Sequence, residues 1–81
     1  MDLENAVLET MRSYLRECGR EECVVEPDSD IMMDLELSSL ELMEVVALLE
    51  EDYGIHVGER ELGSLVQVAD IIDMVRRKTA D

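Results

Sequence analysis

The chain has 81 residues, of which 21 are acidic and seven are lysine or arginine, so its formal net charge is −14. This length allows a single domain, residues 1–81, without room for a deep catalytic cleft, and the charge disfavours binding to nucleic acid or to an anionic membrane. We therefore expect one small domain whose protein partners present basic patches.

The cysteines and the N-terminus indicate a cytoplasmic protein. Cys18 and Cys23 are separated by four residues, which is the spacing of neither a redox Cys-x-x-Cys motif nor half of a four-cysteine zinc site, and His56 is the single histidine. The N-terminal residues lack the apolar core of a signal peptide, and no run approaches membrane-spanning length. We expect two free thiols, no bound metal and a monomer in a reducing cytosol.

The first predicted element is a helix over residues 2–18. Apolar side chains recur there at intervals of three and four residues, the period of a helix with one buried face; they are Leu3, Val7, Met11, Tyr14, Leu15 and Cys18. Gly19 follows and favours the end of the helix.

Residues 19–37 are expected to form a long loop that apolar residues anchor to the core. The stretch starts with the charged run Arg20-Glu21-Glu22 and contains the only proline and an Asp-Ser-Asp turn signal. The expected anchors are the apolar pairs Val24-Val25 and Ile31-Met32, followed by Leu35 and Leu37, which point inward just before the next helix.

Three aspartates in this loop suggest a calcium site, which their spacing excludes. With Asp28 as position 1, Met33 falls where a calcium loop needs glycine, and Ser39 falls where it needs a bidentate glutamate. Weak, diffuse binding of divalent cations to the acidic surface stays open, because it would relieve repulsion among the carboxylates.

The strongest pattern in the chain is a helix over residues 39–53 that opens with two serines. Ser38 followed by Glu41 is a capping box, in which the serine hydroxyl accepts from the Glu41 amide and the glutamate carboxylate accepts from the Ser38 amide. Ser39 then stands at the first helical position, where unpaired amides and the helix dipole favour a phosphate ester. Most serine pairs at helix starts only cap, so this pattern alone makes Ser39 no more than a candidate attachment point.

One face of this helix is apolar, and acids line its exposed side. Leu42, Val45, Val46 and Leu49 recur at the helical period and are expected to be buried. We expect the exposed side next to Ser39 to be a docking surface with apolar side chains at its centre and acids around them; its residues are Leu40, Glu41, Met43, Glu44 and Glu51.

The rest of the chain is expected to form a connector, one short helical turn and a final helix. His56 lies in the connector as an exposed residue without a catalytic role, and residues 58–63 permit one helical turn. The last helix, about 66–78, has Ser64 as an alternative cap and carries four apolar residues inward, which are Val68, Ile71, Ile72 and Val75. Three principal helices and one short one predict an all-α bundle with a single aliphatic core.

The motifs of residues 34–57 resemble the acyl carrier protein family, and the resemblance covers nearly the whole chain, from the first helix to the last. The family pattern runs Asp-Leu, Asp-Ser-Leu-Asp/Glu, Glu-Leu, Leu-Glu-Glu-x-Phe/Tyr-Gly-Ile-x-Ile. This chain has Asp34-Leu35, Ser39-Leu40-Glu41, Glu44-Val45-Val46 and Leu49-Glu50-Glu51-Asp52-Tyr53-Gly54-Ile55-His56-Val57. Ser38 departs from the pattern, because the family has an aspartate there that helps a transferase dock and place its metal and serine. By this resemblance the last helix starts near Gln67.

The resemblance implies a carrier without catalytic residues of its own. A phosphopantetheinyl transferase would move 4′-phosphopantetheine from coenzyme A onto Ser39, and acyl groups would be joined to its thiol as thioesters in fatty acid, lipid or polyketide biosynthesis. The partners would be synthases, transferases or ligases with basic docking patches. The resemblance also implies an acyl-chain pocket between the helices, with the candidate lining residues Ile31, Met32, Val45, Val46, Leu49, Val57, Leu62, Leu65, Ile71 and Val75.

Several alternatives stay open at the level of the sequence. From a different class, the rival is a small acidic helical interaction module without a prosthetic group, in which Ser38 and Ser39 only cap a helix. A hydrolytic or metal-dependent enzyme is disfavoured because ligand spacing and a nucleophile with its base are both missing. Glu36-Leu37-Ser38 does not match the Gly-Gly-x-Ser-Leu of peptide synthetase carriers, and a D-alanyl carrier is more distant. The acyl group is not indicated.

Overall fold

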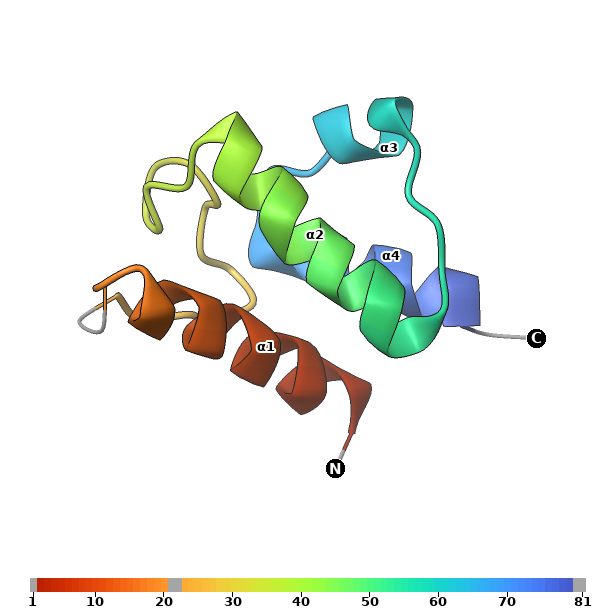
Figure 1. Cartoon of the computed structure of the whole chain (residues 1–81), viewed down its shortest axis with the longest axis horizontal. Coiled ribbons are helices and arrows are strands. Elements are labelled where there is room, and N and C mark those ends of the chain that lie inside the picture. The colour runs from red at the N-terminus through yellow and green to blue at the C-terminus, as the bar shows by residue number, and fades with distance from the viewer. Residues whose placement is uncertain (1, 21–22, 80–81) are drawn as a thin grey trace.

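The computed structural model describes residues 2–20 and 23–79, and these residues form four helices and no strand (Figure 1). The helices are α1 (Leu3–Glu17), α2 (Ser39–Tyr53), α3 (Glu59–Gly63) and α4 (Val68–Thr79). The predicted all-α bundle of three principal helices and one short helix is confirmed. None of the helices in the described part of the chain is long and apolar enough to cross a bilayer.

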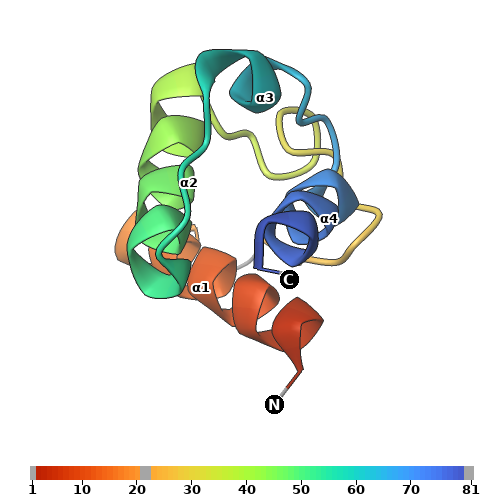
Figure 2. The ribbon, with the colours of Figure 1, turned by 90° about the vertical axis from the view of Figure 1, so that its right-hand side faces the viewer.

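Helices α1, α2 and α4 surround one aliphatic core, and α3 lies beside the N-terminal half of α2 (Figures 1 and 2). The apolar face predicted for α2, from Leu42 to Leu49, is buried, as is the face predicted for α4. Met74 of α4 is also buried, although it was not among the residues predicted to point inward.

Helix α1 is one residue shorter at each end than predicted. The Asp2 side chain caps its start by accepting from the amide of Asn5 at 2.8 Å. At its end Gly19 has φ +80°, a left-handed conformation that glycine adopts without steric cost, and the Arg20 amide returns to the carbonyl of Leu15 at 2.8 Å. Cys18 was expected on the buried face, but it is the exposed C-cap residue, because the turn begins there.

The long first loop is fastened to the segment that enters α4. An isolated antiparallel bridge joins Asp30 to Gln67, with the Ile31 amide donating to the Val66 carbonyl at 2.8 Å. The predicted anchors Val25, Ile31, Leu35 and Leu37 are buried, whereas their neighbours Val24 and Met32 are exposed. Each predicted apolar pair therefore contributes one anchor, as expected where successive side chains point in different directions. Glu21 and Glu22 lie outside the described residues.

The start of α4 agrees with the later of the two predicted positions. The Asp70 carboxylate accepts from the amides of Gln67 at 2.9 Å and Val66 at 3.0 Å, and these hydrogen bonds lower the pKa of Asp70. Ser64, the alternative cap, instead ends α3.

Candidate functional site

Ser39 lies at the first position of α2, outside the hydrogen bonds that cap the helix. Ser38 has extended backbone, its hydroxyl accepts from the Glu41 amide at 3.2 Å, and its own amide donates to Glu41 Oε1 at 2.9 Å. The predicted capping box is thus present, and it leaves Ser39 exposed. The arrangement presents a primary hydroxyl to solvent at the positive end of a fifteen-residue helix.

The Glu41 carboxylate stabilises the start of α2 through contacts with Ser38 and Arg20. The hydrogen bond from the Ser38 amide, followed by the interaction with Arg20, lowers the pKa of Glu41 below its ordinary value. Arg20 Nη2 lies 3.0 Å from Glu41 Oε2, and Arg20 Nη1 donates to the Glu36 carbonyl at 3.1 Å. The charge at the helix start is therefore partly neutralised within the molecule.

The contact between Arg20 and Glu41 was not predicted. In the sequence Arg20 belongs to a charged run at the start of a loop, whereas the structure brings it to a carboxylate 21 positions further along. Helical periodicity and capping patterns describe contacts within a few residues, so no local signal could have indicated this pair.

A small pocket of about 190 Å³ opens beside Ser39, between α2, α3 and the first loop. It brings Ser39 together with three residues predicted for the acyl-chain pocket, namely Met32, Leu62 and Leu65. The other lining residues were not predicted to belong to a pocket, and these are Leu42, Met43, Glu59 and Gly63. The pocket gives the hydroxyl an apolar neighbourhood on one side.

The remaining candidate pocket residues lie in or against the closed core. Val57 is half-buried and packs against the core, and the others are buried within it, namely Ile31, Val45, Val46, Leu49, Ile71 and Val75. An acyl chain would reach them only if helices moved apart, so their role in a pocket stays a prediction.

Four of the five predicted docking residues are exposed on α2. Leu40 is 67% exposed and Met43 52%, and Glu44 and Glu51 are exposed as well. Glu41 differs, because its carboxylate is half-buried against Arg20. Each docking assignment stays a prediction, and the structure gives Glu41 an internal partner.

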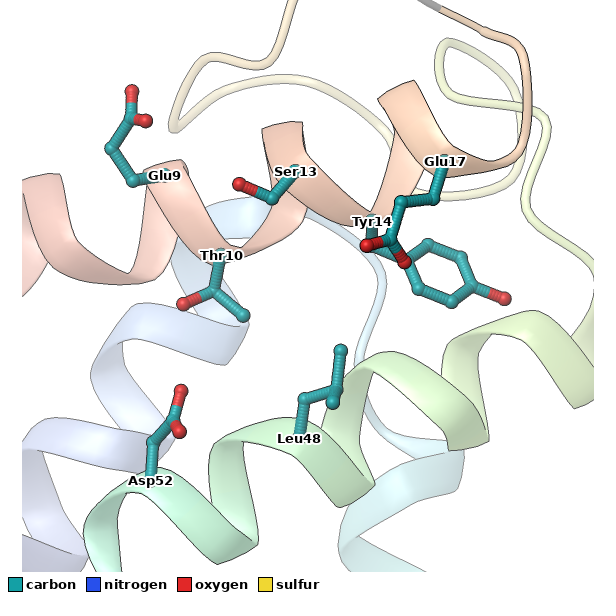
Figure 3. Close-up of a pocket in the computed structure, with 7 residues that line it drawn as sticks. All are labelled: Glu9, Thr10, Ser13, Tyr14, Glu17, Leu48 and Asp52. Atoms are coloured by element: carbon teal, nitrogen blue, oxygen red, sulfur yellow. The ribbon is translucent and has the colours of Figure 1, made fainter.

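A larger groove of about 310 Å³ separates α1 from the second half of α2 (Figure 3). Its lining residues on α1 are Glu9, Thr10, Ser13, Tyr14 and Glu17, and those on α2 are Leu48 and Asp52. Burial, and then the hydrogen bond to Glu44 Oε1 at 2.8 Å, raises the pKa of Tyr14, so this phenol remains neutral at physiological pH. Ser13 has no histidine beside it in this lining, so the groove lacks the pairing that activates a serine nucleophile.

The other titratable candidates form no metal centre within the described parts of the chain. No group of three or more histidine, cysteine, aspartate or glutamate residues there could hold a metal ion. Cys18 and Cys23 are free thiols. The His56 side chain is 91% exposed, and its Nδ1 lies 3.5 Å from Glu50 Oε2.

Comparison with known proteins places these features in a family. The model of the phosphopantetheine attachment site family matches residues 6–75. An acyl carrier protein of Thermosynechococcus vestitus is 32% identical over 56 residues, which are 69% of each chain. An acyl carrier protein of Rubrobacter xylanophilus is 29% identical over 75 residues, 93% of each chain. Polyketide-8 synthase acyl carrier protein 2 of Streptomyces avermitilis is 33% identical over 57 residues, 70% of this chain and 66% of that protein.

The fold agrees with a solved member of the same class. The crystal structure of an acyl carrier protein from Thermotoga maritima superposes with a TM-score of 0.79 over 96% of this chain and 91% of that one, at 18% sequence identity. This protein belongs to the acyl carrier protein family, whose members bear a phosphopantetheine attachment site.

Proposed function

We propose that this protein carries acyl intermediates as thioesters on a 4′-phosphopantetheine arm attached to Ser39. The observation that supports this most directly is that the two adjacent serines differ in their contacts: the Ser38 side chain caps α2, whereas Ser39 is exposed and takes no part in the cap. Among the described residues, Ser39 occupies the position of the serine in the family motif, is exposed to solvent and lies at the N-terminus of a helix.

The residues around Ser39 fit such an arm. A phosphodiester on its oxygen would lie near the unpaired amides and the positive dipole end of α2. Met32 and Leu62, which line the adjoining pocket, offer apolar contact to the stem. When bound, the arm supplies a terminal thiol for thioester formation, and the protein supplies the tether and the docking surface.

The attachment step is a phosphoryl transfer to the Ser39 hydroxyl. Its oxygen forms a new bond to the phosphorus that bears pantetheine, while the pyrophosphate bond of coenzyme A breaks and adenosine 3′,5′-bisphosphate leaves. A base of the phosphopantetheinyl transferase takes the hydroxyl proton. The contribution of this chain is an accessible, correctly oriented hydroxyl.

The exposed side of α2 is the surface we propose for docking. Leu40 and Met43 give it an apolar centre, and Glu44 and Glu51 give it charge that matches basic patches on the transferase and on acyl-processing enzymes. Brief, salt-sensitive docking suits a carrier, because a tethered acyl group reaches a high effective concentration at each docked active site.

The pathway is fatty acid synthesis or a specialised lipid or polyketide route. Relatives named for acyl carriage in general and for a polyketide synthase are similarly close in sequence. Ser38, at the position of the family's aspartate, removes one acid from the transferase contact and bears on which transferase acts. We place the protein in the cytoplasm as a monomer, since two free cysteines suit a reducing compartment and the net charge of −14 opposes self-association.

Intact mass after co-expression with a phosphopantetheinyl transferase tests the proposal. Wild type and Ser38→Ala are expected to gain the mass of one phosphopantetheine, and Ser39→Ala is expected to gain none. A wild type that stays unmodified under several transferases would favour an acidic interaction module without a prosthetic group. A modified Ser39→Ala would move the attachment site elsewhere.

The docking surface is tested by charge reversal. Glu44→Lys is expected to lower the kcat/KM of loading on the order of tenfold, whereas Glu9→Lys on α1 makes the same charge change with little effect. Tyr14→Phe removes the hydrogen bond to Glu44 without a charge change and is the control for that contact. Equal effects of the two reversals would show that only net charge matters.

A further inference from the structure

The backbone just before the attachment serine is held in an uncommon conformation. Glu36 has φ +54° and is the one non-glycine residue with a left-handed backbone in the described part of the chain. A β-carbon makes this conformation unfavourable, so surrounding contacts must hold it. Within the loop the Leu35 amide donates to the Asp30 carbonyl and the Leu37 amide to the Ile31 carbonyl, both at 3.2 Å, and Arg20 adds contacts from the end of α1.

The Arg20 guanidinium supplies contacts on both sides of the two serines. Its Nη1 donates to the carbonyls of Glu36 at 3.1 Å and Leu35 at 3.5 Å. Its Nη2 lies 3.2 Å from Glu41 Oε1 and 3.0 Å from Oε2. Because the guanidinium is planar and its donors have a fixed geometry, these contacts also fix the orientation of the loop relative to the first turn of α2.

Arg20 is itself attached to the core at the end of α1. Its amide donates to the carbonyl of Leu15 at 2.8 Å, and the Leu15 side chain is buried. The Arg20 guanidinium in turn binds the Glu41 carboxylate, whose Oε1 accepts a hydrogen bond from the Ser38 amide at 2.9 Å. One side chain thus links the position of α1 to the residue that precedes Ser39.

On this geometry we propose that Arg20 is a positioning residue, which orients Ser39 for attachment of the arm by clamping Leu35, Glu36 and Glu41 together. This proposal rests on the proposed function. It also assigns the Glu41 charge to the clamp and leaves Glu44 and Glu51 as the acids available to partners.

The kinetics of loading by the transferase distinguish positioning from docking, because Arg20→Ala is expected to impair the positioning of Ser39 without weakening the docking of the transferase. Loss of the clamp is expected to lower kcat of transferase loading on the order of tenfold, since a misplaced hydroxyl reacts more slowly. The same change exposes the Glu41 carboxylate, so KM for the basic transferase is expected to stay equal or fall. Arg16→Ala, at an exposed position in the last turn of α1, removes the same charge and is expected to leave kcat unchanged.

Two further measurements keep the proposal falsifiable if Arg20→Ala does not fold. Arg20→Lys keeps the charge but loses the forked pair of donors of the guanidinium. Its kcat is expected to lie between those of wild type and Arg20→Ala. If Arg20→Ala does not fold, the kcat of Arg20→Lys is still expected to be lower than that of wild type. In the unmodified protein, the amide resonances of Ser38 and Ser39 are expected to shift in Arg20→Lys and not in Arg16→Ala. Wild-type values of both kcat and these amide shifts in Arg20→Lys would overturn the clamp.

The amide measurement also distinguishes failure of this inference from failure of the proposed function. It uses protein without an arm and reports only whether Arg20 orients the serines. A wild type that no transferase loads, together with shifted amides, would refute the attachment and retain the clamp. A wild type that loads normally, together with an Arg20→Ala that matches Arg16→Ala in kcat, would refute the clamp and retain the attachment.

Discussion

Helices α3 and α4 follow one another in the chain and are held in different ways. Helix α4 buries five side chains, Val68, Ile71, Ile72, Met74 and Val75, whereas α3 buries none. Besides the half-buried Leu62, α3 is retained by an ion pair between Glu61 and Lys78 of α4 at 2.9 Å. The core therefore depends on α4, and α3 is attached to its surface.

This difference matters because α3 forms one wall of the pocket beside Ser39. Glu59, Leu62 and Gly63 line that pocket from α3, opposite Leu42 and Met43 of α2. An element with few buried contacts opens locally at a smaller free-energy cost than global unfolding. We therefore expect the pocket to open more readily on its α3 side than on its α2 side.

The largest expected effect on the free energy of unfolding comes from truncating a buried side chain of α4. Ile71 is fully buried, so Ile71→Ala is expected to lower the free energy of unfolding by about 2–5 kcal/mol. Leu62→Ala removes a half-buried side chain from α3 and is expected to cost roughly 1 kcal/mol. Urea unfolding followed by circular dichroism measures both, and equal losses would contradict the distinction between the two helices.

A smaller effect is expected at the start of α4. Asp70→Ala removes the acceptor for two backbone amides and is expected to lower the free energy of unfolding by about 1 kcal/mol. Asp73→Ala, on the exposed side of the same helix, is the control, since its ion pair with Arg76 is solvent-exposed. A cost for Asp73→Ala as large as that for Asp70→Ala would show that net charge, rather than capping, is responsible.

The ion pair between α3 and α4 is expected to act locally. Lys78→Ala is expected to change global stability by less than about 1 kcal/mol, because the pair is partly exposed. Amide hydrogen exchange in α3 is expected to accelerate severalfold while exchange in α4 stays close to wild type. Equal acceleration in both helices would mean that α3 is an integral part of the core.

Acid is expected to loosen α3 by removing the same pair. The hydrogen bond from Lys78, followed by that from the Gly58 amide, lowers the pKa of Glu61 below its ordinary value of 4.5. A lowered pKa means that the folded state favours the carboxylate, so this stabilisation is complete above pH 4.5 and disappears as pH falls through the lowered pKa. The protection of α3 amides against exchange, corrected for the intrinsic exchange rate at each pH, should therefore fall as the pH drops below 4.5 in wild type but not in Glu61→Gln, which has no carboxylate to protonate at this position; an identical acid response would contradict this account.

The sequence predicted those parts of the structure that depend on local patterns. The capping box at Ser38 and the buried face of α2 follow from spacings of three and four residues, and both are confirmed. Cys18 was wrongly assigned to the buried face, because periodicity does not indicate where a helix gives way to its turn. The bridge between Asp30 and Gln67 also required the tertiary structure.

The candidate site shows the same limit. The exposure of Ser39 followed from its place after the cap, whereas the Arg20 clamp spans distant segments and has no periodic signal. Periodicity also marked Val45 and Ile71 as apolar and inward, but it cannot distinguish a closed core from a pocket lining. That distinction depends on how the helices pack against one another, which sequence spacing does not encode.

The most direct test of the account is to locate the arm between two adjacent serines. The protein loaded by a transferase is digested, and fragmentation of the peptide that contains Ser38 and Ser39 assigns the added mass to one residue. The account predicts phosphopantetheine on Ser39, with Ser38 unmodified in its capping role. An arm on Ser38, or on a residue outside this peptide, would contradict it.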